Sequence, residues 1–362
     1  MFAQGPINIK DGPGHNARHH MEETTTYNQQ SLGNDSHYCE PDDTYKYQVY
    51  TAVYIVVFVV GLIFNVAALY VFCKINKKRG PSTLCLMNLA AADLLFIIFL
   101  PLRISYFRRD ATWIFGDIMC RITTFSFYFS MYTSIFFLAC LSVFRYFSVT
   151  SHGTINVKKI VRVCALIWIF TGVSTSPFLL SGSLERENKT RCFEPPGMPT
   201  WTRLMYMNYY ALIVGFIVPF LIILGFNGLL IRHIIHIPME KRHVRRQVTL
   251  IVLVLLVCCV CFLPYHIQRT VHLYYMVHHP DICSLHNVLQ RTVVATLCLA
   301  IFNSCLDPLL YVFVGHGFKT WILLMCKPKG SVNVRHLSSE SGEANVALVE
   351  EVQMDETMVR KT

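Results

Sequence analysis

Long apolar stretches alternate with short polar connectors along most of this chain. Each stretch reaches at least the roughly 20 residues that an α-helix needs to cross a bilayer. An odd number of spans places the two termini on opposite sides of the membrane. The pattern predicts seven membrane spans: Tyr50 to Phe72, Leu84 to Phe107, Ile118 to Phe147, Val161 to Ser181, Met205 to Ile231, Val248 to Val271 and Val288 to Val314.

Composition and charge agree with a membrane protein. Of 362 residues, 53% are hydrophobic and only 15% are charged, whereas soluble domains carry about 25%. Basic side chains gather in connectors on one side, which predicts that these are cytoplasmic and that the N-terminus is outside. The net charge of +10 then reflects membrane topology, and nothing further supports a nucleic-acid partner. The basic residues are Lys74, Lys77, Lys78, Arg79, Lys158, Lys159, Arg162, Arg232, Lys241, Arg242, Arg245 and Arg246.

Polar residues inside two spans are candidates for function. Asn303, Asp307 and Tyr311 recur every four residues and therefore share one helical face. A carboxylate at mid-membrane costs roughly 2.5 to 3.5 kcal/mol, so Asp307 and Asp93 should face the bundle interior. Pro308 directly follows Asp307 and should loosen the helix there. Two buried acids and a flexible joint indicate a switch.

The ends of the chain carry processing signals. Met1 to Gln30 lacks the apolar core of a signal peptide, so the first span should direct insertion. Asn34 and Asn188 begin glycosylation sequons on the predicted outer side. The segment from Lys327 to Thr362 has no apolar periodicity, which predicts a disordered tail. Its serines are candidate phosphorylation sites, and a solvated tail without regulation is the alternative.

The 14 cysteines divide by predicted compartment. Those within spans are interpreted as packed reduced thiols rather than metal ligands, because their surroundings are apolar. On the outer side, Cys120 and Cys192 form one candidate disulfide, and Cys39 and Cys283 form another; free surface thiols are the alternative. Cys326 follows an amphipathic stretch on the cytoplasmic side, which predicts palmitoylation, with an unmodified thiol as the alternative.

Basic and phenolic side chains near the outer ends of the spans suggest an acidic, apolar ligand. Arg103 and Arg269 lie near these ends, and Tyr265 lies one turn below Arg269 on the same face. Tyr128 lies about two turns below Cys120, where its hydroxyl suits a carboxylate or a peptide group. The alternative is that each arginine reaches lipid phosphate.

Other classes of protein receive little support. The chain contains no GxxxxGK[ST], HExxH or GxSxG motif, so we predict that it is not an enzyme. A retinal protein needs a lysine in the last span for its Schiff base, and none occurs from Val288 to Val314. A membrane transporter is the alternative from a different class, although repeated halves are not evident.

Seven marks in sequence order resemble the rhodopsin-like class of G-protein-coupled receptors. Any single mark is weak, but the ordered set is specific and covers the chain from Tyr50 to Cys326. The marks are Asn65, Asp93, Arg145, Trp168, Pro219, Phe262-Leu263-Pro264 and Asp307-Pro308-Leu309-Leu310-Tyr311.

Three further segments narrow the resemblance to the cysteinyl leukotriene receptors, type 1 in particular. They are Pro264 to Leu273, Arg191 to Pro196 and Leu100 to Arg103. The resemblance implies that a leukotriene binds at Arg103, Tyr128, Tyr265 and Arg269, while His266 and His272 are expected to be packed. Receptors for nucleotides or another anionic metabolite share the Asp-Pro ending and are the alternative.

The resemblance also assigns roles in signalling. Arg145, Phe262, Pro264, Asp307, Pro308 and Tyr311 match positions for activation and G-protein coupling, and Asp93, Ser134, Asn303 and Asp307 match a sodium site. Oxygen ligands suit a hard cation, and a water-filled network is the alternative. Two positions depart from the class: Phe144 stands where an acid usually precedes the arginine, and Asn227 stands where a tyrosine is common.

The sequence therefore predicts an all-α membrane protein, a seven-transmembrane helix bundle with a short amphipathic eighth helix. We expect a plasma-membrane receptor that activates a heterotrimeric G protein of the Gq type, without a cofactor apart from the sodium ion. Arrestin and receptor kinases at the tail and membrane lipid are the further expected partners. The expected parts are an extracellular tail (1–47), the receptor domain (48–314), the amphipathic helix (315–326) and a cytoplasmic tail (327–362).

Overall fold

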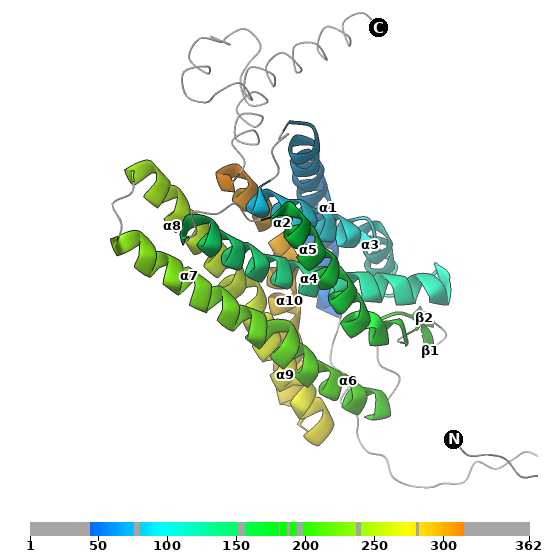
Figure 1. Cartoon of the computed structure of the whole chain (residues 1–362). Helices are drawn as coiled ribbons and strands as arrows, with labels where there is room; N and C mark the ends of the chain where they lie inside the picture. Colours follow the sequence, from blue (N-terminus) through cyan, green and yellow to red (C-terminus); the bar gives the residue numbers. More distant parts are fainter. Residues whose placement is uncertain are drawn as a thin grey trace, which may run out of the picture. The chain divides into compact units, whose positions relative to one another are not determined.

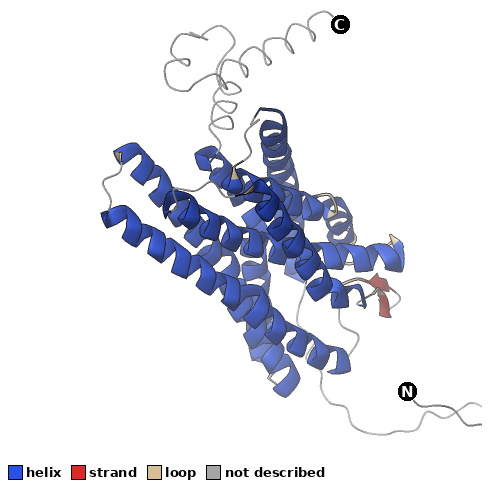
Figure 2. Cartoon of the chain, viewed as in Figure 1, coloured by secondary structure: helices blue, strands red, loops and turns tan. Residues whose placement is uncertain are grey.

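Seven helices long and apolar enough to cross a membrane are present among the described residues. The computed structural model describes residues 44–75, 80–150, 156–180, 182–186, 189–193, 198–236, 240–279 and 282–314. The helices are arranged as a bundle (Figure 1) and account for nearly all of the described secondary structure (Figure 2). The predicted seven-helix fold is confirmed, and the proposed eighth helix at 315–326 lies outside the described residues.

The spans extend beyond the apolar stretches seen in the sequence, because helical turns continue into polar flanks. The helical elements are α1 (Thr44–Tyr70), η1 (Val71–Ile75), α2 (Pro81–Ile97), α3 (Leu100–Arg108), α4 (Gly116–Thr150), α5 (Val157–Thr175), η2 (Ser176–Leu180), α6 (Met198–Tyr210), η3 (Ala211–Ile217), α7 (Val218–His236), α8 (Lys241–Leu256), η4 (Val257–Phe262), α9 (Leu263–His278) and α10 (Cys283–Val314).

Prolines divide three of the spans into segments. The second span is split between α2 and α3 just before Pro101, which cannot donate a backbone hydrogen bond. The π-helical segments η3 and η4 lie immediately before Pro219 and Pro264. Such segments often mark functional positions in helices. No pattern in the sequence predicts them.

Helix α4 lies at the centre of the packing. It contacts α2, α5 and α7, while α1 packs on α2 and α10, and α9 packs on α6 and α10. Gly215 of η3 permits a close approach to α4, since a Cβ atom there would lie 2.8 Å from the ring of Tyr132. The core therefore lies between helices that are far apart in sequence.

Large apolar side chains also cover the faces that point away from the core. Ile235 is 74% exposed and Val173 is 68% exposed. Soluble proteins seldom expose apolar patches of this kind, whereas a lipid bilayer covers them. These faces agree with the membrane location that the sequence predicts.

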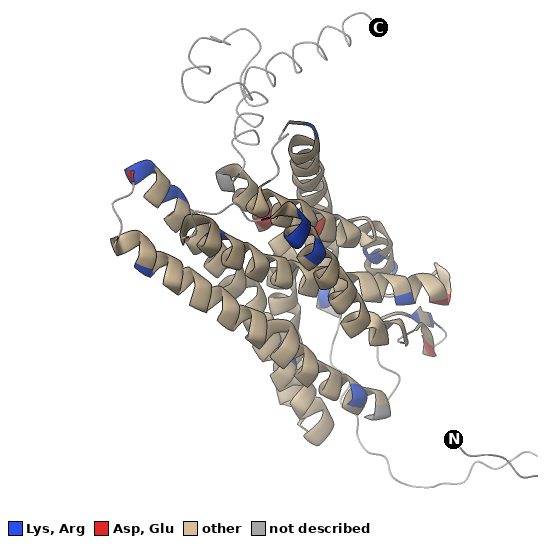
Figure 3. Cartoon of the chain, in the orientation of Figure 1, with Lys and Arg blue, Asp and Glu red and all other residues tan. Residues whose placement is uncertain are grey.

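A short hairpin lies at one end of the bundle. Strands β1 (Leu184–Arg186) and β2 (Lys189–Arg191) pair antiparallel, with Leu184 opposite Arg191. We call this the hairpin end and the opposite end the Arg145 end. In Figure 3 the ribbon positions of Lys and Arg lie at both ends, with few along the middle of the helices.

Candidate functional site

The structure joins three of the predicted ligand residues in one cluster near the hairpin end. Arg269 of α9 donates a hydrogen bond of 2.6 Å to the hydroxyl of Tyr128 on α4 and another to the hydroxyl of Tyr265. Its guanidinium carbon also lies 4.7 Å from the ring centre of Tyr128. We call Arg269, Tyr128 and Tyr265 the arginine–tyrosine cluster.

The fourth predicted residue, Arg103 of α3, lies between two aromatic rings. Its guanidinium carbon is 4.3 Å from the ring centre of Phe193 and 5.1 Å from that of Phe127. It donates a hydrogen bond of 3.2 Å to the carbonyl of Thr123, while its Nε has no hydrogen-bond partner in the described structure. Arg103 is only 6% exposed. It packs in the core and does not extend toward lipid phosphate.

Adjacent rings on α4 bring the two arginines into one region. Phe127, against Arg103, and Tyr128, against Arg269, have ring centres 4.9 Å apart. Neither arginine forms an ion pair with a carboxylate among the described residues. The two guanidinium groups can bind an anionic group through charge-assisted hydrogen bonds. The aromatic rings supply apolar contact and cation–π stabilisation of the arginines.

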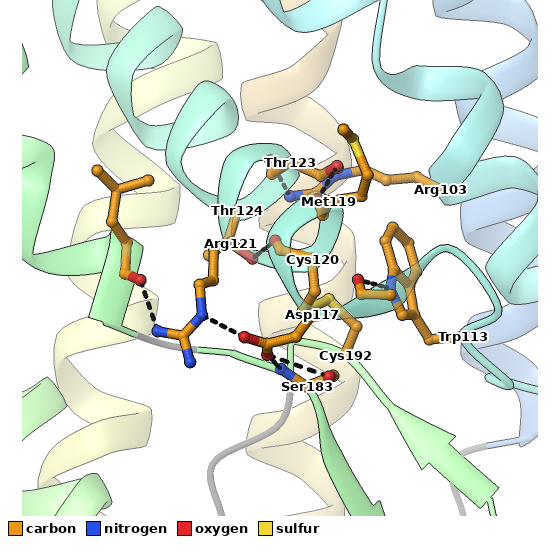
Figure 4. Close-up of a disulfide and its surroundings, with 12 residues drawn as sticks. Arg103, Trp113, Asp117, Met119, Cys120, Arg121, Thr123, Thr124, Ser183 and Cys192 are labelled. Carbon is orange, nitrogen blue, oxygen red and sulfur yellow. Dashed lines mark hydrogen bonds and ion pairs between the residues drawn. A yellow bond between two sulfur atoms is a disulfide. The ribbon is translucent and has the colours of Figure 1, made fainter.

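A disulfide and an ion pair fasten the loop beside this region (Figure 4). Cys120 of α4 is bonded to Cys192, with their Cα atoms 5.9 Å apart, which confirms that predicted disulfide. Asp117 accepts hydrogen bonds from Arg121 at 2.6 Å and from the backbone of Ser183 at 2.7 Å. These contacts place Phe193 next to Arg103.

The two histidines singled out in the sequence are packed side chains. His266 stacks on Phe216 with ring centres 4.4 Å apart, and its Nδ1 lies 2.8 Å from the carbonyl of Phe262. His272 is buried near Trp201, with ring centres 6.2 Å apart. Both placements agree with the packed interpretation.

A polar network crosses the middle of the bundle. The amide of Asn65 on α1 donates to the carbonyl of Ser304 at 3.0 Å, and its Oδ1 accepts from Tyr311 at 3.0 Å. The hydroxyl of Ser304 donates to Asp93 on α2 at 3.0 Å. The predicted Asp307 accepts from Asn303 at 3.1 Å. The stripe on α10 therefore faces the interior, as predicted.

Pro308 explains one of these contacts. A proline has no N–H to offer the carbonyl four residues earlier, which here belongs to Ser304. The Asn65 amide donates to that carbonyl instead. Helix α10 continues through Pro308, and the flexible joint expected there stays a prediction.

Four oxygens of the network form a candidate cation site. Asp93 lies within reach of Ser134 and Asp307, and the buried atoms Asp93 Oδ2, Ser134 Oγ, Asn303 Oδ1 and Asp307 Oδ1 form no well-placed hydrogen bond in the described part of the chain. Each belongs to a residue of the sodium set that the sequence predicts. Buried oxygens without well-placed partners are costly and suit a hard cation, so the residues present fit sodium.

Arg145 is held at the opposite end by a neutral partner. It donates hydrogen bonds of 2.8 Å to the backbone carbonyl and 2.9 Å to the side chain of Gln247 on α8. Its Nε and Nη1 have no partner among the described residues. Phe262 is fully buried at the end of η4, and Pro264 follows in α9.

The departure at Asn227 has its own contact. The side chain of Asn227 on α7 is buried and donates a hydrogen bond of 3.1 Å to Ser142 on α4. Asn227 thus ties α7 to α4 in this structure. Its partner Ser142 lies about one helical turn from Arg145 on α4.

Several predicted sites lie outside the described residues. They are Cys39, Asn34, Asn188 and Cys326. Cys283 begins α10, but its side chain is likewise not described. The second disulfide, both glycosylation sites and palmitoylation stay predictions.

Sequence reasoning missed Phe193, Gln247 and Ser304. Phe193 adjoins Cys192, so the predicted disulfide was a usable signal for it. Gln247 and Ser304 contact Arg145 and Asp93 across the bundle, and no local pattern shows which helical faces meet.

Comparisons with known proteins cover most of the helical region. Residues 64–311 match the model of the 7 transmembrane receptor (rhodopsin family). The chain is 38% identical over 286 residues to cysteinyl leukotriene receptor 1 of Homo sapiens, covering 76% of this chain and 85% of that receptor. It is 38% identical to cysteinyl leukotriene receptor 2 of Sus scrofa, covering 76% and 81%. It is 31% identical to a purinoceptor of Rattus norvegicus, covering 85% of each.

Proposed function

Because this chain belongs to the rhodopsin family of seven-transmembrane receptors and is of the cysteinyl leukotriene receptor type, we propose that its ligand is a cysteinyl leukotriene. It is a multi-pass plasma-membrane receptor that takes a ligand and a G protein as partners, and it is not an enzyme. Family membership also removes the transporter alternative. The proposed orientation has the hairpin end outside and the Arg145 end in the cytoplasm.

The ligand proposal depends on one observation: two arginines contact aromatic rings and, within the described part of the chain, no carboxylate. Arg269 donates to two phenolic oxygens, and a ligand carboxylate would form stronger, charge-assisted hydrogen bonds. Arg103, between Phe127 and Phe193, offers a second cation in an apolar setting. A leukotriene combines carboxylates with a long apolar chain, which matches both features.

A receptor for nucleotides is the second candidate, favoured by the similarity to a purinoceptor. The test is the calcium response of transfected cells to cysteinyl leukotrienes and, in parallel, to the nucleoside diphosphates ADP and UDP. The proposal expects a response to a leukotriene that is lost in Arg269→Ala. A response to the nucleotides alone would overturn it.

The four buried oxygens support a sodium ion as an allosteric ligand of the polar network. Asp93, Ser134, Asn303 and Asp307 would hold the ion, which supplies charge neutralisation between two buried carboxyl groups. Sodium should then weaken agonist affinity in the wild-type receptor and have no effect in Asp93→Asn. Equal sodium dependence in both would favour the water-filled network.

We assign activation and G-protein coupling to Arg145, Phe262, Pro264, Asp307, Pro308 and Tyr311, of which Arg145 marks the end that meets the G protein. The proposed transducer is of the Gq type, with calcium release as its output. Arrestin and receptor kinases would act on the tail at 327–362. Inositol phosphate accumulation that persists when Gq proteins are deleted from the cells would overturn the Gq assignment.

A further inference from the structure

A second cleft lies at the hairpin end, separate from the arginine–tyrosine cluster. Its volume is about 790 Å³, and it is bordered by α1, the end of α3, Asp110 and strand β2. None of Arg103, Tyr128, Tyr265 and Arg269 lines it. Small-molecule sites usually have volumes of about 300 to 1,000 Å³. We call it the α1 cleft.

The α1 cleft opens away from the core of the bundle. Its α1 wall includes Gln48, Ala52 and Ile55, which are exposed and share one helical face. Tyr50 and Tyr54, on another face of α1, are buried in the core. Since α1 starts at the hairpin end, Ile55 lies roughly 10 Å deeper along the span than Gln48. The cleft therefore extends from the polar end of the span toward the bilayer interior.

The polar end of the cleft is mainly basic. Of the described residues that line it there, Arg108, Lys189 and Arg191 are basic and a single one, Asp110, is acidic. Among the described residues, Arg108 and Lys189 form no ion pair or side-chain hydrogen bond. Figure 3 shows basic segments at the end of α3 and on the hairpin. Its deeper part is apolar, with Ala52, Ile55 and Phe107.

One cation of the basic rim, Arg191, is held in place by hydrogen bonds to its surroundings. Arg191 donates hydrogen bonds of 3.4 Å to the hydroxyl of Tyr47 and to the carbonyls of Asp110 and Ala111. Asp110 and Ala111 have positive φ angles of 48° and 56°, a backbone conformation that residues other than glycine rarely adopt. The N–H of Trp113 also donates to the carbonyl of Thr190 at 2.7 Å. A side chain ordered in advance, as Arg191 is, loses little entropy when it binds an anion.

We propose that the α1 cleft binds a single-chain anionic lipid from the adjacent leaflet. Its headgroup contacts Arg108, Lys189 and Arg191, and its acyl chain lies along Ala52 and Ile55. The charge of the rim and the apolar depth below it select this amphiphile over a zwitterionic or purely apolar lipid. The acidic segment Glu40 to Asp43, which precedes α1 in the sequence, offers matching charge but no acyl chain.

The test uses the full-length receptor in phosphatidylcholine nanodiscs with a diazirine analogue of oleate as the probe. Adducts are mapped by peptide mass spectrometry, and we expect them on α1 between 48 and 55. Arg108→Gln with Lys189→Gln should lower labelling at least fivefold, as should Ala52→Phe, which fills the cleft without changing charge. The matched control is Arg109→Gln with Arg203→Gln, which removes two exposed cations outside the cleft and should preserve labelling.

Four results would overturn the proposal. Equal labelling by the diazirine analogue of oleyl alcohol would show that charge is not recognised. Labelling unaffected by both cleft variants, or adducts on other helices only, would place the lipid elsewhere. A several-fold gain in Asp42→Asn with Asp43→Asn would identify the receptor's own tail as the occupant. Surface expression of every variant is measured alongside, so that a folding defect in one cleft variant leaves the other to decide.

Discussion

Arg269 and Arg145 are both held inside the bundle without a carboxylate partner in the described structure, yet their surroundings differ. Arg269 is half-buried and donates to the hydroxyls of Tyr128 and Tyr265, next to a second arginine. Arg145 is 3% exposed and donates twice to Gln247 on another helix. We propose that the first arginine exchanges these partners for a ligand, whereas the second is bonded to a neighbouring helix.

The difference shows how one residue type serves two tasks. A guanidinium that donates only to neutral oxygens can still gain energy by binding an anion, because hydrogen bonds to a carboxylate are stronger. At Arg269 we propose that a ligand carboxylate forms these stronger hydrogen bonds. Arg145 instead faces α8, and its hydrogen bonds to Gln247 stabilise the arrangement of α4 and α8 in this structure.

The largest effect is expected from Arg269→Ala. Losing one partner of a desolvated ion pair costs about 2 to 5 kcal/mol, which corresponds to roughly 30-fold or more in agonist potency. The calcium dose–response curve is measured at matched surface expression, with Arg203→Ala as the control for loss of an exposed cation. Arg103→Ala should also weaken the response. Unchanged curves for both Arg269→Ala and Arg103→Ala would end the ligand assignment.

A smaller effect is expected from the second predicted disulfide, which would brace the end where Arg269 lies. Cys39→Ser and Cys283→Ser should weaken leukotriene binding to the same extent, and the double variant should add little, because both changes break one bond. Radioligand binding to membranes measures this. Additive losses in the double variant would show that the two cysteines act separately.

At the other arginine, Gln247→Leu should raise basal signalling. It removes one of two hydrogen bonds to a charged group, a loss of about 1.5 kcal/mol, while the bond to the backbone carbonyl remains. Gln247→Glu should lower basal signalling, since a carboxylate accepts more strongly. Basal inositol phosphate accumulation at equal expression is the measurement. Identical basal output in both variants would mean that Gln247 does not restrain Arg145.

Local patterns were sufficient for some of these features. The length and apolar character of each stretch predicted the spans. The four-residue spacing placed Tyr265 on the same helical face as Arg269, where the two form a hydrogen bond. The pairing of Cys120 with Cys192 followed from compartment and position. Each of these features could be predicted because it depends on the sequence of one segment or on a chemical constraint that few residues satisfy.

Contacts between distant helices could not be predicted in this way. Arg145 meets Gln247, and Asn65 meets the carbonyl freed by Pro308, because helices have particular rotations and tilts in the bundle. The sequence of one helix does not specify these rotations. The π-helical segments η3 and η4 depend likewise on packing around Pro219 and Pro264 rather than on propensity alone.

The smallest effects concern Phe144 and Asn227, the two departures from the receptor class. Phe144→Asp places an acid beside Arg145 and should reduce basal signalling, with a coupling of about 1 kcal/mol.

Asn227→Tyr removes the hydrogen bond to Ser142 that ties α7 to α4 in this structure, and should raise the maximal agonist response. Ser142→Ala is the matched control, because it breaks the same bond without adding a phenol. Both outputs are read as inositol phosphate accumulation at equal expression. If Ser142→Ala raises the maximum as much as Asn227→Tyr, loss of the bond to Ser142 is the cause. If Asn227→Tyr lowers the maximum, Asn227 itself supports the active state, and the tyrosine common in the class has no equivalent role here.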